Sequence, residues 1–245
     1  FKVFYLVHIM KINKTLIFTA TYNEAENISK LLDSILFQKL DADVYIIDDN
    51  SPDKTSEIIK SYSNKYPNIL LKIRSGKLGL DTAHKEAYLF AKNNKYKKFI
   101  SMDADLSHDP KELSKFILLL DKYPFVIGSR YISGGKNKMT FFRLFLSYFG
   151  NQLIKIVLKL PNTEFTTSYR GFNIEKLGEF NLNIVSSKGY SFFMETIFRI
   201  NKLGFKIKEI PIIFENRSKG KSKIPKIETL RTLKNIFLLL INKIN

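Results

Sequence analysis

The first half of the chain alternates short apolar runs with longer segments in which apolar residues recur every three or four positions. Short apolar runs between turn residues predict buried strands, and the wider spacing predicts amphipathic helices. The predicted strands are 14–22, 43–49, 68–74, 97–103 and 125–131. The predicted helices are 23–39, 51–66, 81–94 and 110–123. Repeated strand–helix units predict an α/β fold whose mostly parallel sheet is flanked by helices.

The second half contains longer apolar segments, which predict helices at 140–160, 189–205 and 226–244 and a strand at 206–216. The segment 140–160 is apolar around nearly its whole circumference, so it is either a core helix or a helix in a membrane interface. No acidic residue occurs from Lys122 to Thr163, a stretch with seven basic residues. Because anionic headgroups attract Lys and Arg, this charge pattern favours the interface.

The chain shows no internal repeat and no convincing linker, so we expect one domain over residues 1–245 with a core at about 14–223. The candidate membrane-interface helices are then 139–160 and 226–244. Residues 1–9 precede Met10, and we expect them to be peripheral to the fold. No apolar run reaches the roughly 18 residues that a spanning helix needs.

The formal net charge of +17 predicts an anionic partner, which can be nucleic acid, a phosphorylated substrate or an anionic membrane surface. General solubility of a lysine-rich chain is the alternative explanation of the charge. The absence of cysteine excludes disulfides and thiolate metal sites.

Paired carboxylates follow two of the predicted strands. Asp48 and Asp49 stand in "YIIDDNSPDKT", and Asp103 and Asp105 stand in "ISMDADLSHDP". The carboxyl ends of parallel strands meet at one rim of a sheet, so these groups and Glu24 are expected to converge there. Neighbouring carboxylates repel one another, and a divalent cation is a natural compensation. Oxygen ligands favour Mg²⁺ or Mn²⁺ shared with substrate phosphates.

The alternative is that each aspartate caps a helix or a turn. We prefer that interpretation for Asp53 and Asp109 and the metal interpretation for Asp103 and Asp105. The glycine patterns of dinucleotide-binding folds and P-loops are absent from the sequence. Phosphates are therefore expected to be held by a cation and side chains.

A set of motifs then occurs in order along most of the chain: "TATYNEAENI", "YIIDDNSPDKT", "GKLGLDTA", "MDADLSHDP", "GSRYISGG", "EFTTSYRGF", "GYSFFMET" and "NRSKGKSK". Together they resemble the inverting family-2 glycosyltransferases of GT-A (Rossmann-like) fold, and more narrowly the dolichol-phosphate (polyprenol-phosphate) mannose synthases. The sequence departs from the common pattern of that family at Asp81, Glu164, Ser168 and Lys221. These departures weaken the prediction of the sugar more than the prediction of the reaction class.

The resemblance implies transfer of a sugar, most readily mannose from GDP-mannose, to a polyprenyl or dolichyl monophosphate with inversion. A UDP-sugar donor, or a sugar hydroxyl as acceptor, is the open alternative. By the same resemblance Asp103 and Asp105 would bind Mg²⁺ or Mn²⁺, and the catalytic residues would be these two and Arg130. The nucleotide would contact Thr21, Tyr22, Glu24, Asp48, Asp49, Asp103, Ala104, Asp105, Arg217 and Lys223. The lipid phosphate would contact Arg130, Arg143 and Ser147.

An acceptor phosphate is already ionised at neutral pH, so it needs positioning by arginine rather than a strong general base. His84 and His108 are accordingly expected to be structural. Two rival classes are a nucleic-acid-binding protein and a nucleotidyltransferase. The carboxylate rim would repel a nucleic-acid backbone, so no nucleic-acid partner is expected. We expect a cytoplasmic enzyme that lies on the cytoplasmic face of a membrane, with a small membrane subunit as a further partner to consider.

Overall fold

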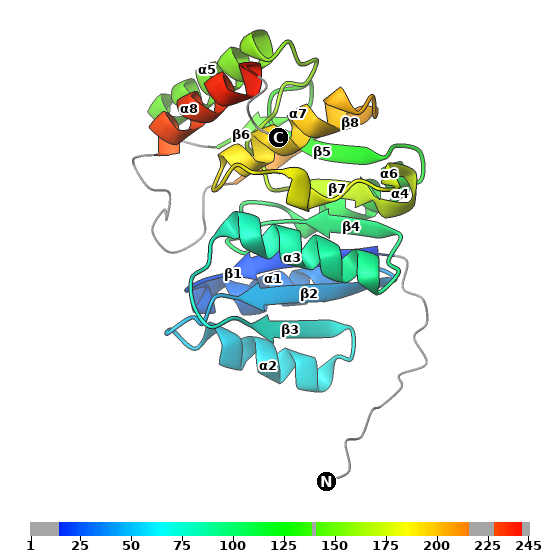
Figure 1. Ribbon diagram of the computed structural model, residues 1–245. Coiled ribbons are helices and arrows are strands. Elements are labelled where there is room, and N and C mark those ends of the chain that lie inside the picture. The colour runs from blue at the N-terminus through cyan, green and yellow to red at the C-terminus, as the bar shows by residue number, and fades with distance from the viewer. Residues whose placement is uncertain (1–14, 139–140, 216–227, 242–245) are drawn as a thin grey trace.

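The computed structural model describes residues 15–138, 141–215 and 228–241 (Figure 1). Arg217, Lys221 and Lys223 lie outside the described residues, as does the segment 1–9. The strands are β1 (Thr15–Thr21), β2 (Ala42–Asp48), β3 (Ile69–Ile73), β4 (Lys98–Ser101), β5 (Phe125–Ser129), β6 (Lys136–Asn137), β7 (Arg170–Asn173), β8 (Ile207–Pro211) and β9 (Ile213–Phe214). The helices are α1 (Ala25–Phe37), α2 (Thr55–Lys65), α3 (Leu80–Asn93), α4 (Leu113–Leu120), α5 (Phe141–Val157), α6 (Ile174–Leu177), α7 (Ser191–Lys202) and α8 (Glu228–Leu240), with 3-10 turns η1 (Pro110–Glu112) and η2 (Leu182–Ile184).

In the described part of the chain, the main sheet has seven strands in the order β3-β2-β1-β4-β7-β5-β8. The pairs β3–β2, β2–β1, β1–β4 and β5–β8 are parallel, which confirms the predicted mostly parallel sheet. The exception is β7, which the sequence pattern did not predict and which runs antiparallel to both β4 and β5. The short strands β6 and β9 form a separate parallel pair. The strand predicted at 206–216 is therefore divided into β8 and β9.

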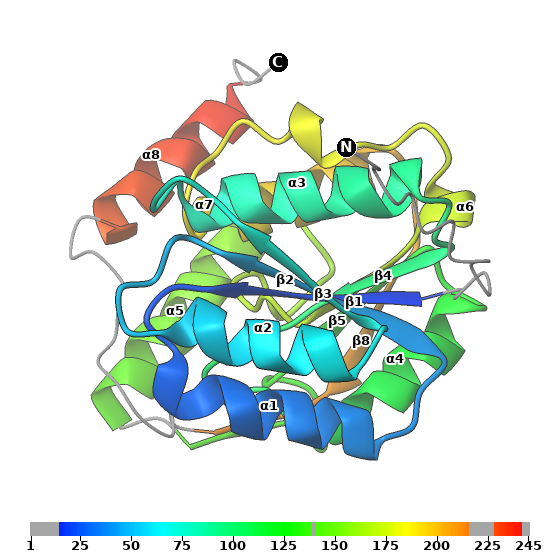
Figure 2. The same ribbon diagram turned by 90° about the horizontal axis from the view of Figure 1, so that it is seen from below.

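Helices cover both faces of this sheet, with α3 and α7 on one side and α1, α2 and α4 on the other (Figure 2). Each face of the sheet packs against its own hydrophobic core. Successive side chains of β1 point into these two cores alternately, because side chains alternate between the faces of a strand. Leu16 and Phe18 join the core beneath α3 and α7, and Ile17 joins the core beneath α1 and α4.

The helices α5 and α8 lie side by side at one end of the sheet (Figure 1). Ile154 and Leu158, at the end of α5, and Leu239 of α8 are buried in the core shared with α7. Phe149 and Phe237 are exposed on the same two helices. One face of each helix is therefore part of the core and another is exposed, and the membrane interface stays a prediction for the exposed faces. Within the described residues, no helix has both the length and the apolar character needed to cross a membrane.

Candidate active site

Asp48, the last residue of β2, links the end of β1 to the loop that follows β2. Its carboxylate accepts hydrogen bonds from Thr21 Oγ1 at 2.7 Å, from Ser51 Oγ at 2.6 Å and from the Ser51 backbone N–H at 2.8 Å. Asp48 is 0% exposed and Thr21 is 2% exposed. A direct nucleotide contact by either residue remains a prediction, and their burial favours a supporting role beneath the rim.

Asp53 ties the beginnings of α1 and α2. Its carboxylate accepts from the backbone N–H of Ala25 at 3.0 Å and from the backbone N–H and hydroxyl of Thr55 at 3.2 and 2.5 Å. Burial raises the pKa of Asp53, but these hydrogen bonds outweigh it and the pKa lies below its usual value. The predicted capping role of Asp53 is confirmed, as is that of Asp109, which accepts from the Lys111 N–H at 3.0 Å.

Asp49 forms a buried ion pair with Arg74, which follows β3. Arg74 Nε donates to Asp49 Oδ1 at 2.5 Å, while its Nη1 and Nη2 donate to Thr82 Oγ1 and the Gly79 carbonyl at 2.7 and 3.2 Å. Burial raises the pKa of Asp49, and the guanidinium of Arg74 opposes that rise. Sequence reasoning missed Arg74, although its place at the end of a predicted strand was a usable signal.

Tyr22 and Glu24, the other predicted nucleoside contacts, lie on the adjoining loop. The ammonium of Lys77 lies 4.7 Å from the centroid of the Tyr22 ring, a cation–π arrangement. Glu24 is 6% exposed and accepts from Asn27 Nδ2 at 2.8 Å. The Asp49 backbone N–H donates to the Thr21 carbonyl at 3.0 Å, so the loops after β1 and β2 meet. Glu24 and Asp49 therefore lie at one part of the rim, as predicted from the carboxyl ends of the strands, and Tyr22 lies on the same loop as Glu24.

Asp103 and Asp105 follow β4, and a serine hydroxyl holds one oxygen of each. Ser168 Oγ donates to Asp103 Oδ1 at 2.5 Å, and Ser107 Oγ donates to Asp105 Oδ1 at 2.5 Å. Leu106 adopts a φ of 64°, and this left-handed residue returns the chain so that Ser107 reaches Asp105. The Asp103 side chain is 36% exposed, whereas the whole residue Asp105 is 9% exposed. Ala104 between them is buried.

The buried side chain of His108 forms a hydrogen bond with the backbone of this turn. Its Nδ1 accepts the Asp103 backbone N–H at 3.1 Å, so the neutral ring carries its proton on Nε2, which lies 3.4 Å from Thr167 Oγ1. Burial lowers the pKa of His108, and the nearby Asp103 opposes this shift. His84 packs edge-on against Phe18 and Phe193, and burial followed by repulsion from Arg170 lowers its pKa to about 3. Both histidines occupy structural positions, as expected.

Arg130, directly after β5, is paired inside the chain. Its Nε and Nη2 donate to the two carboxylate oxygens of Glu164 at 2.7 and 2.9 Å, and Nη2 also reaches Thr166 Oγ1 at 3.0 Å. Burial lowers the pKa of Arg130, but the Glu164 carboxylate outweighs burial and the pKa is raised. The same pairing lowers the pKa of Glu164 against the effect of burial. A phosphate that approaches Arg130 would meet a guanidinium already held in place.

The predicted acceptor residue Ser147 lies near this pair. Its hydroxyl is 2.7 Å from that of Tyr131, whose ring centroid is 5.4 Å from Arg130 Cζ. Arg143 lies on the same helix, α5, and its side chain lies outside the described residues. The structure therefore connects Arg130 and Ser147 through Tyr131, and the position of the Arg143 side chain stays a prediction.

The carboxylates of Asp103 and Asp105 suit a cation that is shared with a substrate. Among the described residues, no group of three or more His, Cys, Asp or Glu side chains is arranged to hold a metal ion. Mg²⁺ commonly uses only one or two carboxylates and takes the remaining ligands from water and phosphate. This donor set consequently fits Mg²⁺ or Mn²⁺ bound jointly with a diphosphate.

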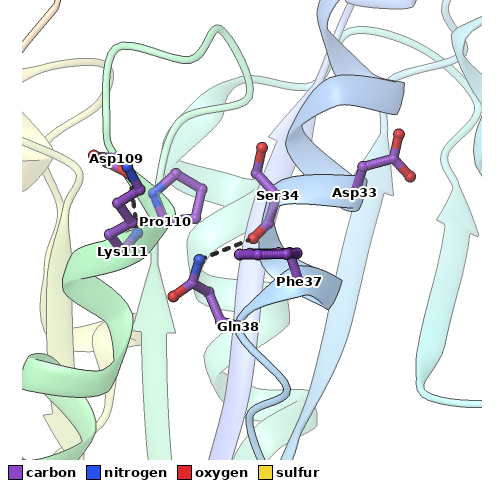
Figure 3. A pocket seen from close by; sticks show the side chains of 7 residues that line it. All are labelled: Asp33, Ser34, Phe37, Gln38, Asp109, Pro110 and Lys111. Atoms are coloured by element: carbon purple, nitrogen blue, oxygen red, sulfur yellow. Dashed lines mark hydrogen bonds between the residues drawn. The ribbon is translucent and has the colours of Figure 1, made fainter.

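A pocket of about 430 Å³ lies away from these residues, between the end of α1 and η1 (Figure 3). Phe37 is the last residue of α1 and Gln38 directly follows it, and Pro110 and Lys111 come from η1. None of the described residues that are predicted to bind substrate lines this pocket.

Residues 16–180 match the profile described as Glycosyl transferase family 2. The chain belongs to this family. Undecaprenyl-phosphate mannosyltransferase of Micrococcus luteus is 34% identical over 83% of this chain and 84% of the relative. Polyprenol monophosphomannose synthase of Mycolicibacterium smegmatis is 32% identical over 86% of this chain and 81% of the relative. The family predicted from the motifs, and with it glycosyltransferase activity, are confirmed.

Two solved structures share the fold of this family-2 enzyme. The mannosyltransferase PcManGT of Pyrobaculum calidifontis, in complex with GDP-Man and Mn²⁺, has a TM-score of 0.58 and 18% identity over 94% of this chain. The chain spans 64% of the length of that structure, which is less than two thirds. Glucosyl-3-phosphoglycerate synthase of Mycobacterium tuberculosis, with Mn²⁺ and UDP, has a TM-score of 0.63 and 14% identity over 94% of this chain and 79% of its own. The predicted GT-A fold is confirmed.

Proposed function

We propose that this glycosyltransferase transfers mannose from GDP-mannose to a polyprenyl monophosphate, with inversion at the sugar carbon. The observation that carries the proposal is that one chain segment contacts both Asp103 and Arg130, through Ser168 and Glu164. Asp103 and Asp105 suit a cation-bound diphosphate, and Arg130 suits an anionic acceptor. The names of the two curated relatives supply the sugar and the lipid.

On the donor side, Tyr22, Glu24 and Asp49 would contact the nucleoside, and Arg217 and Lys223 would reach the nucleotide from the segment after β9. Asp103 and Asp105 would hold Mg²⁺ or Mn²⁺. When bound, the cation would neutralise charge on the departing diphosphate.

On the acceptor side, the phosphate oxygen is itself the nucleophile. The work of the protein is to orient that oxygen toward the sugar carbon and to exclude water. Arg130 is suited to this task because Glu164 fixes the plane of its guanidinium. Ser147 and Arg143 on α5 would supply further hydrogen bonds to the phosphate. No side chain is required as a general base, which agrees with the structural positions of His84 and His108.

The exposed faces of α5 and α8 would lie against the membrane that holds the acceptor. The large apolar residues exposed on these helices are Phe145, Tyr148, Phe149, Leu153, Ile156, Leu233, Phe237 and Leu240. The α5 residues of this set lie within the acid-free stretch from Lys122 to Thr163, so an anionic headgroup layer would be attracted to the same region. We therefore propose peripheral association with the cytoplasmic face of a membrane. A small membrane subunit would be a competing occupant of this surface.

One assay tests the proposed reaction. The protein is incubated with Mn²⁺, a polyprenyl monophosphate and one radiolabelled donor at a time: GDP-mannose, UDP-glucose or UDP-N-acetylglucosamine. We expect label from GDP-mannose to enter the organic phase as a lipid-linked monosaccharide of inverted configuration. Transfer from a UDP-sugar alone, or transfer to a sugar hydroxyl but not to the lipid phosphate, would overturn the proposal.

A further inference from the structure

We propose that Ser168 is a positioning residue for Asp103, one of the two metal ligands, and this inference rests on the proposed function. Its hydroxyl donates to Asp103 Oδ1 at 2.5 Å across 65 positions of sequence. Ser168 is 3% exposed, whereas the Asp103 side chain is 36% exposed. The hydrogen bond therefore anchors the carboxylate from the protein interior while the carboxylate stays accessible at the rim.

The hydroxyl of Ser168 is held in place by the backbone around it. The Ser168 carbonyl accepts from Ser101 Oγ at 2.6 Å, so the residue is fastened to the end of β4. The preceding carbonyl, of Thr167, accepts from Arg170 Nε at 2.6 Å. The following carbonyl, of Tyr169, accepts from the Gly128 N–H at 2.9 Å. Three successive carbonyls are thus bonded to three different partners, which fixes the backbone position from which the Ser168 hydroxyl reaches Asp103.

Asp105, the second predicted metal ligand, also accepts a hydrogen bond from a serine, but this serine is close to it in sequence. Ser107 lies two residues from Asp105 and donates to it at the same distance, 2.5 Å, within the turn. Ser168 differs because it arrives from the segment that also carries Glu164, the partner of Arg130. Asp103 is therefore oriented by the same segment that orients the predicted acceptor arginine.

This arrangement has a physical consequence for metal binding. A carboxylate whose rotamer is fixed before the cation arrives loses less conformational freedom on binding. Groups that hydrogen-bond to metal ligands typically contribute 10- to 100-fold to metal affinity or activity. A serine that only stabilises the fold would contribute to the unfolding temperature and leave metal affinity unchanged.

The test measures Mn²⁺ binding directly. Free Mn²⁺ is followed by electron paramagnetic resonance during titration of the protein, alone and with GDP. We expect Ser168→Ala to weaken Mn²⁺ binding about 10-fold, and Ser168→Thr, which keeps the hydroxyl, to restore much of the loss. Ser187→Ala is the matched control, because Ser187 is 5% exposed and, among the described residues, its hydroxyl has no hydrogen-bond partner. That control should bind Mn²⁺ like the wild type.

A second variant guards against loss of the fold. If circular dichroism shows that Ser168→Ala is unfolded, Ser168→Cys keeps a similar volume with a weaker donor and should show the reduced affinity. Wild-type affinity in a folded Ser168→Ala or Ser168→Cys protein would overturn the inference. Such a result would leave the metal site of the proposed function intact if Asp105→Asn lost Mn²⁺ binding in the same experiment. A wild-type protein that binds no Mn²⁺, even with GDP, would refute both.

Discussion

Replacing Glu164 with glutamine would leave a buried positive charge without its counter-charge. The side chains of Arg130 and Glu164 are 4% and 0% exposed, and two hydrogen bonds of 2.7 and 2.9 Å join them. Glu164 also accepts from the backbone N–H groups of Thr166 and Thr167 at 3.0 and 3.3 Å. Removing one partner of a buried ion pair costs about 3–5 kcal/mol. We expect Glu164→Gln to lower the free energy of unfolding by about this amount.

An exposed ion pair provides the control for this substitution. Lys97 and Glu175 lie 2.9 Å apart with side chains 43% and 59% exposed. Exposed pairs contribute about 0–1 kcal/mol, so Glu175→Gln should have a small effect. Urea unfolding at neutral pH, followed by circular dichroism, compares the two variants with the wild type. Equal stability of Glu164→Gln and Glu175→Gln would show that Glu164 does not compensate the charge of Arg130.

The pH dependence gives an independent check on the sign of this effect. Burial raises the pKa of Glu164, but Arg130 outweighs it, so the pKa in the folded state lies below the ordinary value of 4.5. A carboxyl group of this kind stabilises the fold above its unfolded pKa and loses that contribution as the pH falls through its folded pKa. The stability difference between wild type and Glu164→Gln should therefore be complete at pH 7 and shrink below about pH 4.5. A difference that grows on acidification would refute the reasoning.

Three further predictions concern the metal, the membrane and the core. Asp105→Asn should abolish sugar transfer without unfolding the protein, and EDTA should do the same to the wild type; full activity in excess chelator would contradict the metal site. Phe145→Ser combined with Phe149→Ser should weaken sedimentation with anionic liposomes, whereas Phe37→Ser, at a residue 79% exposed elsewhere, should not. The neutral His84, with a pKa of about 3 against 6.5 when unfolded, should make the wild type lose stability as the pH falls between those values. In His84→Gln that part of the loss should disappear from the pH dependence of unfolding.

The parallel part of the fold was predictable because its signals are local. Apolar runs and helical spacing gave β1 to β5 and the helices between them, with errors mainly at the ends; α2, for example, begins at Thr55 rather than at residue 51. The gathering of Asp49 and Asp103 on one rim followed from strand polarity alone. The exposed and buried faces of α5 were harder to separate, because apolar residues occur on all sides of that helix.

The strand β7 could not be predicted from its own residues. Its four residues, "RGFN", contain no apolar run, and its first side chain is a fully buried arginine. Arg170 is accommodated because its guanidinium donates to the carbonyls of Phe165, Thr167 and Phe193. Gly171 lets α4 pack closely on β7, because a Cβ there would lie 2.8 Å from Leu120 Cδ1. Each of these conditions depends on chain segments that only the complete fold brings together.

The same limit explains which site residues the sequence revealed and which it hid. Groups that act at strand ends, such as Asp103 and Arg130, could be found from position and charge. Ser168 and Glu164 stand in the motif "EFTTSYRGF", but their pairing with Asp103 and Arg130 could not be predicted, because hydrogen bonds across 65 and 34 positions leave no periodic trace in the sequence. Both partners come from the segment between α5 and β7, which a linear analysis assigns to neither substrate. Because that segment holds one side chain from each predicted substrate site, the donor and acceptor residues share one hydrogen-bonded support. The orientation of Asp103 and Arg130 therefore depends on the segment that leads into β7, as well as on the strand ends that carry these two residues.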